Sequence, residues 1–187
     1  MSVKYKSSSS ISTTFSEEPI SNNKLSQGLN PGIAYTNILL HILNENEKLP
    51  DYNERIEHSI DGHFKRDKKQ QISLLDYLKR ILKYINIETS TLIVSLIYID
   101  RICKEKVFLN EFNIHRIMFI SIIMAYLYNE DETEDEEDLA MIGGVSLEEM
   151  ILLEHDFIDL IDFNFFVDDK IYEQYKSKFL FESDDDY

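Results

Sequence analysis

The segment "IMFISIIMAYLY", residues 117–128, decides how the rest of the chain can fold. It contains one serine and no charged residue, so as a helix it is apolar on nearly every side. Such a helix is stable only where other elements enclose it. The segment is too short for a bilayer span, which takes about 20 apolar residues. We therefore predict a central buried helix that begins at an Asn110 N-cap and runs to about residue 128.

Helical patterns flank this segment on both sides. Ser73 with Asp76, and Ser146 with Glu149, have the spacing of capping boxes that open helices. Further helices are predicted from Thr89 or Ser90 to about residue 104, over 136–142 with a stop at Gly143-Gly144, and from Asp168 or Asp169 onward. No alternating strand pattern is present. The prediction is an all-α fold: one five-helix domain with an extra N-terminal helix and a C-terminal helix.

Composition divides the chain into four parts. Residues 1–30 are rich in Ser, Thr and Asn, a composition that favours disorder. Residues 31–71 are predicted to form a helix that begins at Pro31 and a polar connecting loop over 50–70, anchored by Phe64. The five-helix domain and the C-terminal helix occupy residues 72–181. Residues 182–187 form an acidic tail.

The net charge of −16 is concentrated in one region. Residues 129–169 contain sixteen Asp or Glu and no Lys or Arg. Such a field disfavours nucleic acid and favours a basic protein partner. The alternative is a solvated acidic face. With one cysteine and no apolar N-terminal signal, we expect a soluble chain of the cytoplasm and/or nucleus, without membrane contact and monomeric on its own.

Patterns typical of catalysis are missing from the sequence. The five histidines lack metal-ligand spacing, and neither a phosphate-binding glycine loop nor a nucleophile elbow is present. Nothing positions any of the many carboxylates as an acid or a base. We predict a chain that is not an enzyme and that has no cofactor and no metal.

Two predicted helices each carry one charge among apolar neighbours. Arg80 lies between Leu78 and Ile81, and Asp100 lies between Ile99 and Ile102. If the helices pack against the central one, the two charges can form a buried bidentate pair. In the alternative, both side chains lie at helix ends and reach water.

The segments "DYLKRILKYI", "LIYIDRI", "NIHRIMFISIIMAYLYNED" and "AMIGGVSLEEMILLEHDFIDLIDFNF" together resemble the cyclin box. The order and spacing are most similar to the P/U-type cyclins of the phosphate-signalling kind, and the resemblance covers about residues 64–179. It implies a regulatory subunit that binds the mobile C-helix and the activation segment of a cyclin-dependent kinase and favours the active conformation. It also implies that Arg80 and Asp100 form the ion pair that joins the first two box helices.

The resemblance further implies a kinase contact through the third and fifth box helices, with a lysine late in the third and an acid in the fourth. The chain departs from this pattern, because Leu127 occupies the place of the lysine. The acid falls at Asp138, with Glu137 the alternative. Loss of one charge-assisted bond would weaken the complex by roughly 1.5–3 kcal/mol unless apolar contacts replace it. The predicted kinase-binding residues are Phe119, Ile123, Tyr126, Leu127, Glu137, Asp138, Met150 and Leu153.

These features are compatible with three functions. The first is a cyclin-like subunit that activates a cyclin-dependent kinase. The second is a cyclin-fold adaptor or scaffold that activates no kinase, which the residue at Leu127 favours. The third is a cyclin-fold transcription factor, which the single domain and the negative charge disfavour.

Overall fold

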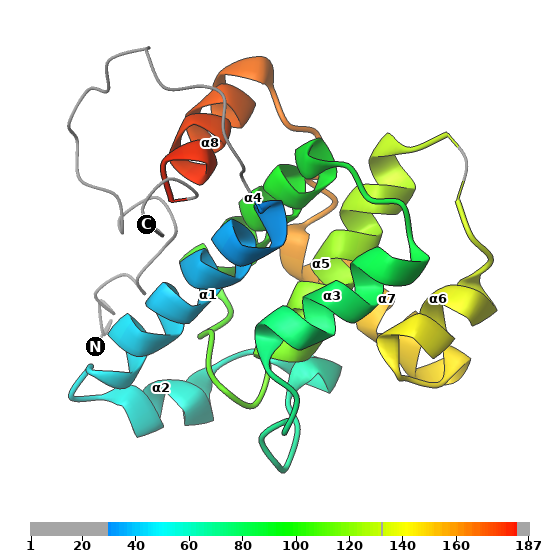
Figure 1. The fold of residues 1–187 in the computed structure, drawn as a ribbon. Helices are drawn as coiled ribbons and strands as arrows, with labels where there is room; N and C mark the ends of the chain where they lie inside the picture. Colours follow the sequence, from blue (N-terminus) through cyan, green and yellow to red (C-terminus); the bar gives the residue numbers. More distant parts are fainter. Residues whose placement is uncertain (1–29, 132, 183–187) are drawn as a thin grey trace.

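The computed structural model describes residues 30–131 and 133–182. Within these ranges the chain forms helices and no strand (Figure 1). The elements are α1 (Pro31–Glu47), α2 (Tyr52–His58), the 3-10 helix η1 (Gly62–Phe64), α3 (Leu74–Tyr84), α4 (Thr89–Glu105), α5 (Ile114–Asn129), α6 (Glu136–Gly143), α7 (Leu147–Ile161) and α8 (Asp169–Glu182). The predicted all-α fold is confirmed: α3–α7 are the five helices, with α1 before them and α8 after them.

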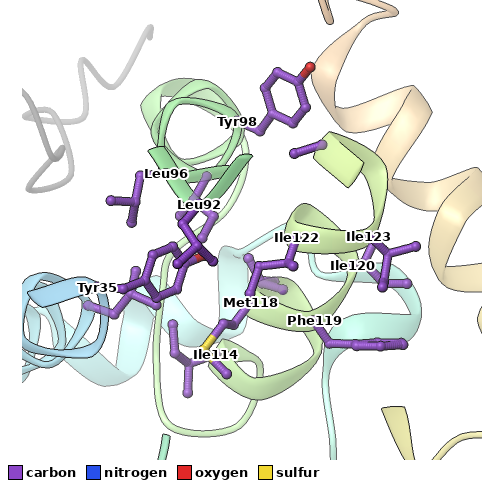
Figure 2. Close-up of a cluster of buried hydrophobic side chains, with 14 of the residues drawn as sticks. Tyr35, Leu92, Leu96, Tyr98, Ile114, Met118, Phe119, Ile120, Ile122 and Ile123 are labelled. Atoms are coloured by element: carbon purple, nitrogen blue, oxygen red, sulfur yellow. The ribbon is translucent and has the colours of Figure 1, made fainter. Parts of the chain in front are cut away.

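Helix α5 lies at the centre, as its apolar sequence predicts. Ten of its residues are buried, from Ile114 to Tyr126, and α3, α4 and α7 pack against it. Figure 2 shows Met118, Ile122 and neighbouring side chains of α5 meeting Tyr35 of α1 and Leu92 of α4. Removing this apolar surface from water, at about 25 cal/mol per Å², is the main force that holds the helices together.

The predicted helix ends are largely confirmed. Ser73 Oγ accepts a hydrogen bond from the Asp76 N–H at 3.1 Å, and Ser146 Oγ accepts one from the Glu149 N–H at the same distance. Gly144 has φ of 73°, in the left-handed region that glycine adopts without strain, and it ends α6. Asp168 Oδ1 accepts from the Ile171 N–H at 2.9 Å at the start of α8.

The prediction of Asn110 as the N-cap of α5 is wrong. The helix begins at Ile114, and Asn113 is the residue before it. Asn110 forms the preceding turn, where its N–H donates to Asn113 Oδ1 at 2.9 Å and its side chain amide donates to the Phe108 carbonyl at 2.8 Å. Asparagine favours turns and caps for the same reason, which is that its side chain mimics backbone hydrogen bonds.

The polar segment 50–70 contains regular secondary structure that the prediction of a connecting loop did not include. It contains α2, a helix without a buried residue, and then η1. Phe64 is fully buried, and its ring packs edge-to-face on Phe157 of α7 with centroids 6.4 Å apart. The predicted anchoring role of Phe64 is therefore confirmed. The short polar α2 lacks the apolar periodicity that would have marked it as a helix.

The predicted ion pair between Arg80 and Asp100 does not form. Asp100 is 1% exposed, and its Oδ2 accepts from Tyr175 Oη of α8 at 2.5 Å and from Lys104 Nζ at 3.1 Å. Arg80 lies on the exposed side of α3, where its Nη2 donates to the Met141 carbonyl at 2.9 Å. Each residue is turned roughly 100° from the next along a helix, so apolar neighbours in sequence did not fix where either charge points.

The predicted tails fall mostly outside the described residues, namely 1–29 and 183–187. The structure does describe one residue of each predicted tail, and both lie at helix ends. Asn30 caps α1, since its Oδ1 accepts from the Gly32 N–H at 3.1 Å, and Glu182 is the last residue of α8.

Candidate functional site

The predicted contact residues belong to one part of the fold: the end of α5, the segment 130–138 and helix α7. Helix α7 packs against both α5 and α6, so these elements are neighbours in space (Figure 1). We use the name α5–α7 face for the exposed or half-exposed residues Leu127, Tyr128, Glu136, Glu137, Asp138, Ile151 and Glu154.

Most of the predicted apolar contact residues are not on this face. Phe119, Ile123, Met150 and Leu153 are fully buried, and Tyr126 is 4% exposed. They form the core between α5, α6 and α7, so their role as kinase-binding residues stays a prediction that the exposed surface does not support. The ring of Phe119 even occupies the space beside Gly143, where an added Cβ would lie 2.2 Å from Phe119 Cζ.

Three of the predicted residues are exposed. Leu127 is 38% exposed on the last turn of α5, and Glu137 and Asp138 are exposed in the first turn of α6. Acidic residues in a first turn stabilise a helix by interacting with the positive end of its macrodipole. Glu137 and Asp138 thus have a local structural role besides any contact with a partner.

An aromatic stack supports the end of α5. Tyr128 is 55% exposed, and its ring stacks on Phe165 with centroids 5.8 Å apart. Phe165 in turn packs edge-to-face on Tyr98 of α4, whose hydroxyl donates to the Phe165 carbonyl at 2.8 Å. The segment between α7 and α8 is therefore fixed against α4 and α5, and it gives the α5–α7 face a rigid border.

The acidic segment after α5 is attached at two points. Glu130 Oε1 accepts from Thr91 Oγ1 at 2.9 Å, and a Glu134 carboxylate oxygen accepts from the Tyr126 hydroxyl. Burial, and then the hydrogen bond with the Glu134 carboxylate, raise the pKa of Tyr126 to about 12. The hydroxyl therefore stays protonated at neutral pH and holds this acidic segment near the end of α5.

Glu154 is a residue of this face that is absent from the predicted kinase-binding residues. It is half-buried on α7, and its Oε1 is buried without a hydrogen-bond partner among the described residues. Burial, and then the nearby Glu136 carboxylate, raise the pKa of Glu154. A buried acceptor without a donor lowers the free energy of unfolding. Its one sequence signal is its place in "LLEHDF", directly after two leucines of the helix.

Ile151 lies next to this carboxylate on the helix surface. Residues three apart share one side of a helix, which places Ile151 beside Glu154. Ile151 is 49% exposed. The face therefore combines exposed aliphatic groups with an acceptor that lacks a donor, a combination typical of a surface that a protein partner covers.

Metal centres and membrane-spanning helices were sought over residues 30–131 and 133–182, and neither is found there. In the part of the chain that it describes, no three His, Cys, Asp or Glu side chains gather closely enough to hold a metal ion. Nor is any of the described helices long and apolar enough to cross a membrane.

The fold defines a class of protein: a five-helix domain flanked by α1 and α8, with a partly apolar and partly acidic face. Comparison with known families identifies it. The model of the family described as Cyclin matches residues 7–165, most of the chain. The chain belongs to the cyclin family, and the predicted resemblance is confirmed.

Individual relatives agree with the P/U-type assignment. The chain is 41% identical over 97 residues to Cyclin-U4-3 of Arabidopsis thaliana, covering 51% of the chain and 44% of that relative. It is 33% identical over 123 residues to Cyclin-U4-2 of the same plant, covering 65% and 57%. It is 37% identical over 99 residues to the PHO85 cyclin-like protein psl1 of Schizosaccharomyces pombe, covering 51% and 41%. The chain thus spans about half the length of the curated relatives it matches.

Proposed function

We propose that this protein is a regulatory subunit that binds a cyclin-dependent kinase and activates it allosterically. Membership of the cyclin family supports the proposal, as do the similarity to P/U-type cyclins and to a PHO85 cyclin-like protein. In this role the protein supplies no catalytic group and is not an enzyme.

The mechanism is a shift between two kinase conformations. A subunit that binds the active arrangement of the kinase's C-helix and activation segment more tightly than the inactive one raises the active population by that difference in affinity. A change from 1:99 to 99:1 needs a preference of about 5.5 kcal/mol. A rigid surface is suited to this, because little of the binding energy is then lost in ordering the subunit itself.

The observation that carries the proposal to particular residues is the unpartnered Oε1 of Glu154. A backbone N–H of the kinase that reaches the exposed part of the Glu154 carboxylate would form a charge-assisted hydrogen bond, typically worth about 1.5–3 kcal/mol. The aliphatic side chains of Ile151 and Leu127 would be covered at the same time. We infer that the apolar contact takes the place of the family's lysine at Leu127.

Co-expression with each cyclin-dependent kinase of the source organism tests this proposal. We expect one of them to copurify in a one-to-one complex and to phosphorylate a protein substrate faster when the chain is present. Glu154→Gln should weaken that complex about tenfold. Glu57→Gln, which removes the same charge from the exposed surface of α2, should leave the affinity unchanged. Absence of both complex and activation with every such kinase would reject the proposal.

A second candidate is a cyclin-fold adaptor that binds its partner without activating it. The observation that favours it is the exposed Leu127 where the family's lysine is expected. A stable complex in which the rate of phosphotransfer is unchanged would select this function over the first.

We also propose that the acidic segment 130–138 complements a basic surface of the partner. Replacing Glu137 and Asp138 by Gln and Asn should then lower the association rate at low salt and reduce the dependence of that rate on ionic strength. Unchanged rates would leave the segment as a solvated acidic surface with a helix-capping role.

A further inference from the structure

A small cavity lies at the opposite end of α5 from Leu127. It has a volume of about 130 Å³ and is enclosed by the loop before α3, helix α3, the first turn of α5 and the turn between α6 and α7. Its charged or titratable lining residues are Arg66, Arg80, His115, Arg116 and Tyr77. The kinase-binding proposal uses none of them.

The cavity concentrates positive charge on a chain whose net charge is −16. Three of its lining residues are arginines, and their charges act on one another. Burial, and then the like charge of Arg66, lower the pKa of Arg116. Holding like charges together is unfavourable unless something compensates them. Arg116 is the only one of the three with an ion-pair partner among the described residues, the Glu149 carboxylate.

The other two guanidinium groups keep unused donors. The structure gives the Arg66 side chain no hydrogen bond within the described residues, although its backbone N–H donates to the Phe112 carbonyl at 3.1 Å. Arg80 donates through Nη2 to the Met141 carbonyl, while its Nη1 lies over Gly144, where an added Cβ would be only 3.5 Å away. Arg80 is thereby held at the cavity with hydrogen-bond donors to spare.

Two buried polar atoms of the lining residues also lack partners. They are Nε of Arg116 and Nδ1 of His115. His115 Nε2 lies 2.9 Å from the Ile72 carbonyl, which can only accept, so Nε2 carries a hydrogen. Nδ1 accepts in the neutral ring and donates in the protonated one. Most buried polar groups are hydrogen-bonded, so these two atoms show that the polar groups beside the cavity are incompletely satisfied.

Contacts within the fold stabilise these cations only in part. Arg116 pairs with Glu149 and donates to the His63 carbonyl, and Arg80 donates to the Met141 carbonyl. His115 and Arg116 lie in the first turn of α5, where the macrodipole is positive and cations are unfavourable. An anion reverses both effects, since it neutralises the arginines and interacts favourably with the start of the helix. The cluster is therefore better explained by binding than by stability.

We propose that this cavity binds a phosphoryl group, as a phosphate ester or free phosphate, through the guanidinium groups of Arg66 and Arg80. Guanidinium is suited to phosphate because its planar donors match two oxygens at once. An adjoining groove of about 450 Å³ shares Arg80 and is lined also by Lys83, Tyr84 and Met141. It offers space for the peptide that would carry a phosphorylated side chain.

Fluorescence anisotropy with a labelled phosphoserine peptide and its unphosphorylated twin tests the proposal on the full chain. The phosphorylated peptide alone should bind. Arg66→Gln and Arg80→Gln should each weaken its binding about tenfold, since each removes a charge-assisted hydrogen bond. Lys79→Gln is the matched control: it removes one charge from the exposed side of α3, outside the cavity, and should change the affinity less than about twofold. Thermal melts verify that all three variants are folded.

Competition identifies the source of the phosphoryl group. If millimolar inorganic phosphate displaces the peptide completely and binds alone in a titration that depends on Arg66, the site is for the free ion. If it competes only weakly, the groove contributes and the ligand is a phosphorylated segment. Equal binding of both peptides, or no binding of peptide or phosphate, would overturn the proposal. An equal effect of Arg80→Gln and Lys79→Gln would do so too.

Discussion

Asp100 of α4 and Glu154 of α7 are carboxylates placed in similar sequence surroundings, each with apolar residues close by in a helix, yet they have different fates in the fold. Asp100 is 1% exposed and meets Tyr175 at 2.5 Å and Lys104 at 3.1 Å. Glu154 is half-buried. Each acid has one buried oxygen without a partner, Asp100 Oδ1 and Glu154 Oε1, but among the described residues only Asp100 has donors on its other oxygen.

The contrast separates an acid that stabilises the fold from one that the fold tolerates. A buried carboxylate with a hydroxyl and an ammonium beside it recovers much of its desolvation cost. A partly buried carboxylate with no donor on either oxygen does not, and natural structures keep few of these. Substitutions at the two sites should therefore move stability in opposite directions, which the following changes test from the largest effect to the smallest.

Asp100→Ala should lower the free energy of unfolding by about 3 kcal/mol. The change leaves the hydroxyl of Tyr175 buried without its acceptor and opens a space between α4 and α8. Urea denaturation followed by circular dichroism measures the loss. Asp67→Ala, at an exposed acid in the loop before α3, serves as control and should cost less than about 0.5 kcal/mol. Equal effects of the two would mean that Asp100 is not a structural residue.

Tyr175→Phe should cost about 1.5 kcal/mol in the same assay, because Asp100 keeps Lys104 but loses its shortest hydrogen bond. Tyr172→Phe is the matched control on the same helix. Tyr172 is half-buried and its ring contacts Lys176, an interaction that phenylalanine keeps. If both variants lost the same stability, the hydroxyl of Tyr175 would have no special role.

Glu154→Gln should have the smallest effect on stability and the opposite sign. The pKa of Glu154 is raised above its ordinary value of 4.5, by burial and by Glu136, so the folded chain binds its proton more tightly than the unfolded chain. The free energy of unfolding therefore falls as the pH rises from about 4.5 through the native pKa, and the glutamine variant lacks this loss.

Urea denaturation at about pH 5 and about pH 7 measures this difference. We expect the variant to gain on the natural chain as the pH rises through this window. Glu57→Gln, at an exposed acid of α2, is the control variant. A constant difference between Glu154→Gln and the natural chain at both pH values would contradict the placement of this carboxylate in a desolvated site.

Local chemistry explains what could be predicted from the sequence. Capping side chains at Ser73 and Ser146 act within a few residues, and the apolar sequence of α5 leaves no stable place for it except the centre. These features depend on neighbours along the chain, so they are readable before the fold is known.

The predictions that differ from the structure depend on the direction in which each side chain points in the folded chain. The prediction of an Arg80–Asp100 pair depends on the apolar neighbours that both residues have in the sequence. In the fold, the Arg80 side chain points toward α6 and the Asp100 side chain points toward α8. Likewise, an all-apolar helix does not reveal which residues its neighbours cover, so Phe119 and Ile123 were expected at a surface and lie in the core. Glu154 could be recognised only once its missing donor was apparent.

The hydroxyl that Asp100 requires comes from α8, a helix outside the five that sequence patterns group together. The boundary of the family domain and the boundary of the cooperative folding unit therefore differ. Helix α8 also packs on α1, so these two flanking helices and α4 should open together. In native-state hydrogen exchange their amides would share one opening free energy, and a fragment that ends at Ile161 would lose protection in the middle of α4, far from the cut in sequence.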